Sequence, residues 1–218
     1  MTTDYERILL AEGIGYSEIL DPKFKTNTLK IFFSQPLSAA TAAGSALATS
    51  LLTASNQRYP SIAQLRKKLQ MLYGAAIFGS VQREGDIQTN HISATVIDDR
   101  YALEQEPLFD EVLELLLDCL FRPNAADGAF SQTEFRIRQQ NLLDTIKAEI
   151  DEKRTYALNQ ARRTAFDGEP AALSPCGTAE EVAALTPASA YAAYQELLRT
   201  AGIEIYFVGP AKKAGLAD

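Results

Sequence analysis

The segment from Ile31 to Gln57 contains no Asp, Glu, Lys or Arg, although 22% of the residues in this 218-residue chain are charged. Three structures accommodate such a neutral segment: a membrane span, a helix buried inside a domain, or a site whose polar groups have been replaced by small ones. A span needs about 20 predominantly apolar residues, and here Gln35, Pro36 and several serines and threonines interrupt the run. We therefore expect the segment to fold inside a domain.

Length and composition favour a folded domain without a basic surface. A chain of this length with 46% hydrophobic residues buries one sizeable core or two small ones. The net charge of −7 argues against a nucleic-acid partner, because phosphate binding needs a concentrated basic surface. The N-terminus has no basic segment followed by an apolar core, so we expect a cytoplasmic protein with no membrane partner.

The Cys and His residues predict neither a metal site nor a catalytic thiol. Cys119 and Cys176 are isolated in the sequence, which suits a reducing compartment, and the apolar neighbours of Cys119 predict a buried, inert thiol. His91 is the only histidine and is expected to occupy an ordinary strand position, because its neighbours offer no metal-binding partners. We therefore predict no cofactor.

Strand-like and helix-like segments occur in pairs rather than in strict alternation. Clusters of β-branched and aromatic residues predict strands at 9–20, 28–34, 75–83, 87–97 and 203–208. Apolar spacings of three and four predict helices at 38–53, 61–72, 106–121 and 131–166, and two short helices begin at Thr178 and Thr186. Ser61 and Ser131 each open a sequence typical of a capping box.

This pairing predicts an α+β fold, with a mainly antiparallel sheet of five to six strands and helices on one face. The neutral helix at 38–53 then lies against the sheet, where an unpaired charge is costly.

The segment 121–194 contains several motifs in a recurring order. A Pro precedes a long helix that begins near a Phe, a Gly-x-Pro break follows at 168–170, and Gly177-Thr178-x-Glu180 precedes Leu185-Thr186-Pro187. In these features the chain resembles the insulinase and mitochondrial-processing-peptidase (M16-type) superfamily of zinc metallopeptidases. The order of elements is also similar to the α/β roll of that superfamily, a LuxS/MPP-like metallohydrolase fold. The segments FKTNT, RYPSIAQLRKKLQMLYGA and DGAF resemble a non-catalytic bacterial branch associated with the aminopentanone modification of elongation factor P.

The resemblance implies a degenerate metal site. In active members the first helix carries His-x-x-Glu-His, which supplies two zinc ligands and a general base, and a later glutamate completes the site. These positions fall on Ala46, Thr49, Ser50 and Thr145. Asp144 replaces Thr145 if the alignment shifts by one residue, and Arg138 stands where a supporting glutamate is expected. Alanine has no donor atom, and the hydroxyls are poor zinc ligands and poor bases at neutral pH. No bound metal is therefore expected.

The resemblance also implies an interaction role. Members that lack the metal motif typically pair with a catalytic partner or serve as scaffolds, so the expected partner is a second M16-like domain or a catalytic M16 subunit. We expect one domain over residues 1–210 and a tail over 211–218, in a fragment that lacks the second domain. In active relatives a strand beside the metal helix binds extended peptide, which makes Gly79, Ser80, Val81 and Gln82 candidate peptide-binding residues near a sheet edge. The alternatives are an enzyme of the zinc metalloendopeptidase family or an enzyme that uses a different, unidentified site.

Overall fold

Strand β3 (Thr26–Pro36) lies inside the sheet of this computed structural model, which describes residues 4–104 and 106–216. Burial alternates along the strand, so that Leu29 and Phe33 face the core while Lys30 and Phe32 lie half-buried on the opposite face. This period of two is the signature of a strand with two different environments. The strand ends at Pro36, because proline has no N–H to donate to a sheet.

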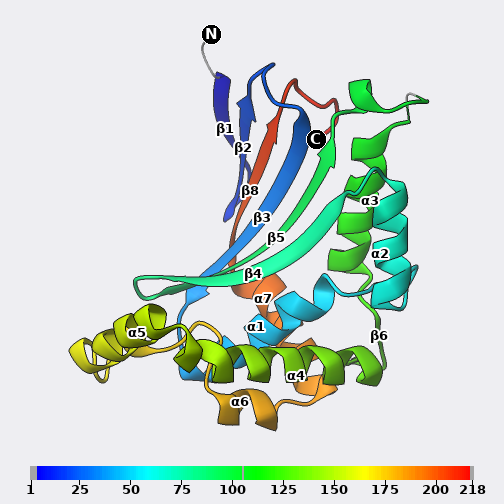
Figure 1. The fold of residues 1–218 in the computed structure, drawn as a ribbon. Helices are drawn as coiled ribbons and strands as arrows, with labels where there is room; N and C mark the ends of the chain where they lie inside the picture. The colour runs from blue at the N-terminus through cyan, green and yellow to red at the C-terminus, as the bar shows by residue number, and fades with distance from the viewer. Residues whose placement is uncertain (1–3, 105, 217–218) are drawn as a thin grey trace.

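Six strands form one mixed sheet in the order β1-β2-β8-β3-β5-β4 (Figure 1). The other five strands are β1 (Asp4–Ala11), β2 (Ile14–Leu20), β4 (Ala76–Glu84), β5 (Ile87–Ile97) and β8 (Gly202–Gly209). All neighbouring strands are antiparallel except β2 and β8, which are parallel. The predicted α+β class and mainly antiparallel sheet are confirmed. The parallel pair was not predicted.

The single strand predicted over residues 9–20 is wrong. The structure has two antiparallel strands there, and the chain reverses at Glu12-Gly13. Gly13 has a φ of 75°, in the left-handed region that glycine adopts at little cost. A glycine inside a run of strand-forming residues thus marks a turn here rather than a flaw in one long strand.

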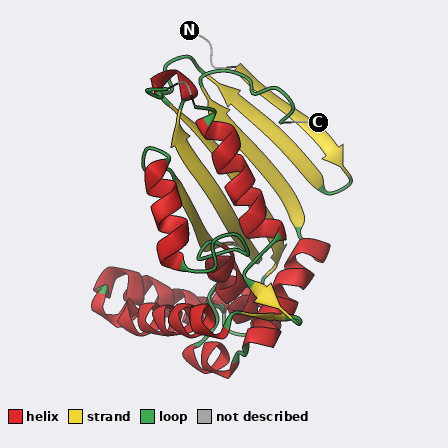
Figure 2. Ribbon diagram, turned by 90° about the vertical axis from the view of Figure 1, so that its right-hand side faces the viewer, coloured by secondary structure: helices red, strands yellow, loops and turns green. Residues whose placement is uncertain are grey.

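Helices cover one face of the sheet (Figures 1 and 2). The helices that contact its strands are α1 (Ala39–Leu52), α3 (Leu108–Phe121) and α7 (Pro187–Thr200), and α2 (Ile62–Met71) lies beside α3. Helix α1 packs against both the sheet and α7, and residues 42–49 are all buried. A Cβ atom at Gly44 would lie 2.9 Å from Ala193 Cβ of α7, so the close approach of the two helices requires a small residue. These contacts confirm that the neutral segment includes a buried helix.

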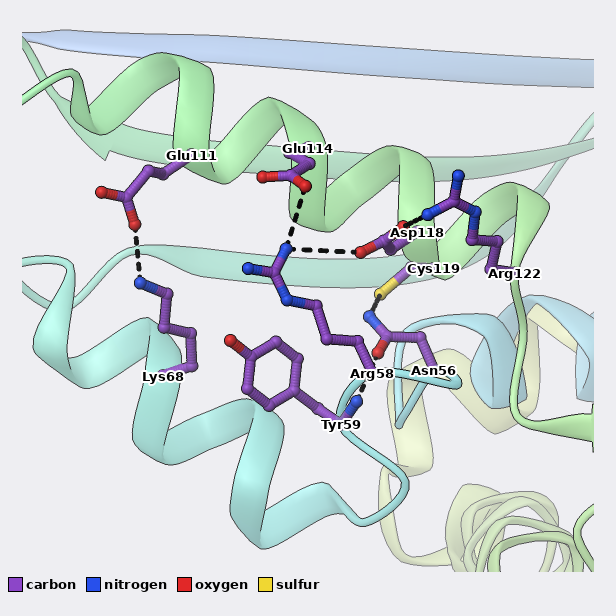
Figure 3. Close-up of polar contacts among 9 residues, drawn as sticks. All are labelled: Asn56, Arg58, Tyr59, Lys68, Glu111, Glu114, Asp118, Cys119 and Arg122. Atoms are coloured by element: carbon purple, nitrogen blue, oxygen red, sulfur yellow. Dashed lines mark hydrogen bonds and ion pairs between the residues drawn. The ribbon is translucent and has the colours of Figure 1, made fainter.

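Polar side chains join α2 and the loop before it to α3 (Figure 3). Lys68 Nζ lies 2.6 Å from Glu111 Oε2, and Arg58 Nη1 lies 3.0 Å from Glu114 Oε1. Asn56, which is fully buried, donates its amide to Cys119 Sγ at 3.5 Å and accepts from the Tyr59 backbone N–H at 2.7 Å. The surface pairs contribute little each, whereas the buried Asn56 contacts fix the loop.

The long helix predicted over residues 131–166 is interrupted. Helix α4 (Gln132–Ala148) passes through a 3-10 turn (Glu149–Asp151) before α5 (Lys153–Ala165) begins. Glu152 leaves the helical region, with φ −88° and ψ 75°. The Ser131 capping box is also wrong, because the Ser131 side chain accepts no cap hydrogen bond. Its backbone N–H instead donates to Asn124 O, next to a short ribbon formed by β6 (Ala125–Ala126) and β7 (Ala129–Phe130).

The predicted helix starts at Ser61, Thr178 and Thr186 agree with the structure. Ser61 accepts from the Gln64 backbone N–H at the start of α2, and Thr178 and Thr186 cap α6 (Ala179–Ala184) and α7. Each of these side chains replaces a missing backbone acceptor in the first turn. Within residues 4–104 and 106–216, no helix combines the length and the apolar character that a membrane crossing would need.

Candidate functional site

The inner face of α1 carries hydroxyl groups that contact polar side chains of β5. Ser45 Oγ donates to Gln88 Oε1 at 2.8 Å, and Thr49 Oγ1 lies 3.1 Å from Asn90 Oδ1. Thr49 Oγ1 also lies 2.9 Å from Ser45 O, one turn earlier in the helix. Small hydroxyl side chains can share their proton in this way inside a helix. All four side chains are buried, so these contacts satisfy polar groups that water does not reach.

Gln88 connects α1 with two further parts of the chain. Its Nε2 donates to Ala42 O at 3.1 Å and to Pro175 O at 2.6 Å, and its Oε1 accepts from Gln35 Nε2 at 2.8 Å. The network joins α1, β3, β5 and the loop before α6. It holds that loop against the helix that the resemblance identifies as the former metal helix.

The degenerate motif positions of α1 contribute packing rather than metal donors. Ala46 belongs to the apolar core and is 4% exposed, while Ser50 is half-buried. Thr49 contacts β5 as described above. In the described part of the chain, no group of three or more His, Cys, Asp or Glu side chains is placed to hold a metal ion.

Helix α4 packs against α1, as the proposed motif arrangement requires. Thr145 is exposed, and its hydroxyl donates to Asn141 O at 2.9 Å. Asp144, the alternative to Thr145, is also exposed and accepts from Gln140 Nε2 at 2.7 Å. Both side chains are therefore engaged within their own helix.

Arg138 gives α4 a positive charge where the resemblance expects a supporting glutamate. Burial and the charge of Arg66 lower the pKa of Arg138, against an opposing effect of Glu134. Its Nε atom is buried and has no hydrogen-bond partner. A guanidinium is a donor without acceptor capacity, so it cannot replace a carboxylate that supports a metal ligand.

Strand β4 forms one edge of the sheet and carries the four candidate peptide-binding residues. Gly79 faces α1, and a Cβ atom there would lie 2.9 Å from Thr49 Cγ2. Ser80 and Val81 are half-buried, and Gln82 is exposed. The position near the sheet edge agrees with the expectation from sequence.

A cavity of about 750 Å³ opens beside the end of β4. Gln82 and Arg83 line it from β4, Thr145 from α4, and Cys176 from the loop before α6. Further residues of α4 and of the loop before α6, the turn after α4, and α5 complete the wall. The structure thus brings Gln82 and Thr145 to one cavity, whereas Ala46, Thr49 and Ser50 do not line it.

Three known proteins are similar to this chain in sequence or in fold. YmfF of Bacillus subtilis (strain 168), described as a probable inactive metalloprotease, is 26% identical over 197 residues, covering 90% of this chain and 46% of that protein. A conserved protein from Enterococcus faecalis V583 is 26% identical with a TM-score of 0.88, over 98% of this chain and 50% of its own. The inactive domain of peptidase M16 from Pseudomonas fluorescens is 15% identical with a TM-score of 0.73, over 96% of this chain and 47% of its own.

The chain has the fold of an M16 peptidase-like domain. No family model matches the sequence. The M16-like domain spans about half the length of the relatives named above. Their names carry no link with elongation factor P.

His91 and the two cysteines lie in environments that suit packing rather than catalysis. His91 is 6% exposed, with its ring centroid 5.3 Å from that of Phe32 and 6.2 Å from that of Phe78. Burial, with a smaller effect of Lys30, lowers the pKa of His91. Burial raises the pKa of Cys119 to about 11 and also raises that of Cys176. Both thiols are therefore poor nucleophiles at neutral pH.

Two groups of residues in this site were missed by sequence reasoning. Gln35, Gln88 and Asn90 occupy core-facing positions of predicted strands, and polar residues at such positions are a usable signal of a buried network. The second group is the arginines that line the cavity, Arg83 of β4 and Arg162 and Arg163 of α5. They gave no such signal, because β4 and α5 lie far apart in the sequence.

Proposed function

We propose that this M16-like domain is a catalytically silent binding module, which takes part in a peptide-binding chamber with a second M16-like domain or a catalytic M16 subunit. The proposal rests on two observations together. Helix α1 lacks side chains that could bind a metal, and the edge strand β4 ends beside a cavity. Main-chain pairing with an edge strand needs no metal, so peptide binding can persist after the hydrolytic groups are lost.

The chemistry of the motif positions argues against zinc-dependent hydrolysis. A catalytic zinc site needs three protein ligands and an open position for water. Ala46 supplies no donor, and the Thr49 hydroxyl is occupied by contacts with Asn90 and the Ser45 carbonyl. Thr145 lies on the cavity wall as a single hydroxyl. These groups cannot deprotonate a water molecule at neutral pH.

Two arguments support the proposed pairing: the fraction of each relative that this chain matches, and the way in which M16 domains usually assemble. M16 domains typically pair with another M16 domain, and this chain matches about half of each relative. The proposed partner therefore corresponds to the other half of those proteins.

The alternative, an enzyme with an unrelated site, has little support from the described residues. The buried His91 has its pKa lowered and contacts aromatic rings, and both thiols have their pKa raised. General acid–base catalysis needs a group whose pKa lies near the working pH and that can reach a substrate.

The test uses the full-length protein and a set of labelled, unstructured peptides. Fluorescence anisotropy measures binding, and mass spectrometry of the same mixtures after long incubation measures cleavage. We expect saturable binding with all peptides left intact, with or without added zinc. Zinc-dependent cleavage that is lost in Thr145→Ala would overturn the proposal that the domain is catalytically silent. If no peptide binds, the peptide-binding role is overturned.

A further inference from the structure

Three arginines line the cavity beside β4. Arg83 comes from β4, while Arg162 and Arg163 come from α5. Two carboxylates, Glu149 and Glu152, line the same cavity. Positive charge is therefore in excess on this wall, although the chain as a whole has a net charge of −7.

The three guanidinium groups are not equally neutralised. Arg163 Nη2 lies 3.8 Å from Glu149 Oε2, which is a long ion pair. Arg83 Nη1 donates to the backbone Gly85 O at 3.3 Å, and Arg162 Nη1 donates to Asn159 Oδ1 at 2.6 Å. Within the part of the chain that the structure describes, neither Arg83 nor Arg162 forms an ion pair. Each keeps a full positive charge with only neutral acceptors.

Arg162 also carries an unused buried donor. Its Nε atom is inaccessible to water and has no hydrogen-bond partner. Burial and the positive charges of Arg83 and Arg163 lower the pKa of Arg162, more than Glu149 raises it. The two other arginines are thus close enough for their charges to act on Arg162. An anionic ligand would reduce the repulsion between these guanidinium groups and would accept a hydrogen bond from the unpaired donor.

Neutral polar groups complete the wall. Gln82, Thr155 and Asn159 line the cavity together with the arginines. Gln82 precedes Arg83 on the edge strand, so a peptide paired with β4 would pass directly beside the guanidinium groups. A side chain or terminus of that peptide could then enter the cavity.

We propose that this cavity binds an anionic group, a carboxylate or a phosphate, whose oxygens accept hydrogen bonds from Arg83 and Arg162. In its peptide form the inference rests on the proposed function and makes it more specific: the extended peptide bound at β4 is acidic. The planar guanidinium group suits both oxyanions, because it offers parallel N–H donors.

The experiment compares two labelled, unstructured peptides that differ only by glutamate or glutamine at the same positions. Binding to the full-length protein is measured by anisotropy at low and at moderate salt, and binding of inorganic phosphate is measured separately by isothermal titration calorimetry. We expect the glutamate peptide to bind about tenfold more tightly, since one charge-assisted contact commonly contributes that factor. Added salt should reduce this difference.

Arg162→Gln and Arg83→Gln remove the charges that the inference uses. Each should remove most of the preference for the acidic peptide and leave the binding of the glutamine peptide unchanged. Arg199→Gln is the matched control, because Arg199 lies on the surface of α7, paired with Glu196, and its loss changes the net charge equally. Melting temperatures of all four proteins show whether each variant is folded.

The outcomes separate this inference from the proposed function. Equal binding of both peptides, unaffected by the two variants, overturns the anion site and leaves peptide binding standing. Phosphate binding that Arg162→Gln weakens, with no binding of either peptide, supports the anion site for a small anion and overturns the peptide-binding function. If neither peptide nor phosphate binds, both are overturned.

Discussion

Gly79 of β4 and Thr49 of α1 approach so closely that a Cβ atom on Gly79 would lie 2.9 Å from Thr49 Cγ2 and 3.0 Å from Thr49 O. Thr49 is one of the positions onto which the resemblance places the degenerate metal motif. In this structure the Thr49 side chain packs against Gly79 of the edge strand, and its hydroxyl contacts Asn90 of the adjacent strand. In this structure Thr49 therefore serves packing between α1 and the sheet.

Gly79→Ala tests this close contact. The added methyl group meets a backbone oxygen as well as a side chain, so the strand or the helix has to shift. We expect the free energy of unfolding to fall by about 1–3 kcal/mol, as is typical of an overpacked core. Urea denaturation measures the change. Gly202→Ala on β8 is the matched control, because its nearest contact would be Ser34 O at 4.0 Å; an equal loss in both variants would refute the contact as the cause.

Much of the fold was predictable because its signals are local. Ser61, Thr178 and Thr186 cap the helices they were expected to cap, and Pro123 follows the end of α3. The interruption between α4 and α5 was not predictable in this way, because the sequence AEIDEK contains neither Gly nor Pro. In the structure α5 packs on the 3-10 turn before it and on the segment Pro170–Ala172 after it, and these tertiary contacts cannot be inferred from local sequence.

The candidate site was predictable only in part. Local sequence placed Gly79 to Gln82 on a strand, and the structure puts that strand at the sheet edge. The cavity arginines come from β4 and α5, which are brought together by the turn after α4 that sequence reasoning missed. Burial of a charged side chain depends on tertiary packing, so composition and periodicity could not reveal it.

The purified protein is predicted to contain well below one zinc ion per chain. The described residues contain no set of donors that could hold zinc, and structural or catalytic zinc needs three or four ligands. Elemental analysis after purification without added metal measures the content. Dialysis against a chelator should leave the melting temperature unchanged, since no metal contributes to folding. Stoichiometric zinc, or a chelator-induced loss of stability, would contradict the degenerate site.

His91 is predicted to make folding stability depend on pH. Its pKa is lowered in the folded state, whereas a histidine in an unfolded chain has a pKa of about 6.5. The unfolded state therefore binds the proton more readily, and stability is lost as the pH falls below about 6.5 toward the lowered pKa of the folded state. Urea midpoints at pH 7.5 and pH 5.5 measure the loss.

His91→Gln removes the titrating ring and is the variant for this test. We expect a smaller decrease in stability between pH 7.5 and pH 5.5 than in the unmodified protein, although the variant can be less stable at both values. An identical decrease would show that other groups cause the pH dependence.

Asn56→Ala is predicted to destabilise the loop between α1 and α2. The fully buried side chain accepts from the Tyr59 N–H and donates to Cys119 Sγ, as Figure 3 shows. Loss of the acceptor leaves a backbone donor without its partner, which costs about 1–3 kcal/mol. Thermal or urea unfolding measures the change. Gln57→Ala serves as the control because Gln57 is exposed, and an equal effect in both variants would argue against the buried contacts.

Separate proline substitutions at Ser80 and Val81 test whether peptide pairs with the edge of β4. Successive N–H groups of a strand point in opposite directions, so one of these two positions donates toward β5 and the other points away from the sheet. Proline at the first kind of position should lower the melting temperature, because it breaks a sheet hydrogen bond. Proline at the second kind should leave the fold intact and weaken peptide binding, because it removes a donor that only the peptide uses. Anisotropy titrations and melting curves of both variants separate the two effects. If the variant that keeps its stability also keeps its full affinity for peptide, the ligand does not pair with this strand.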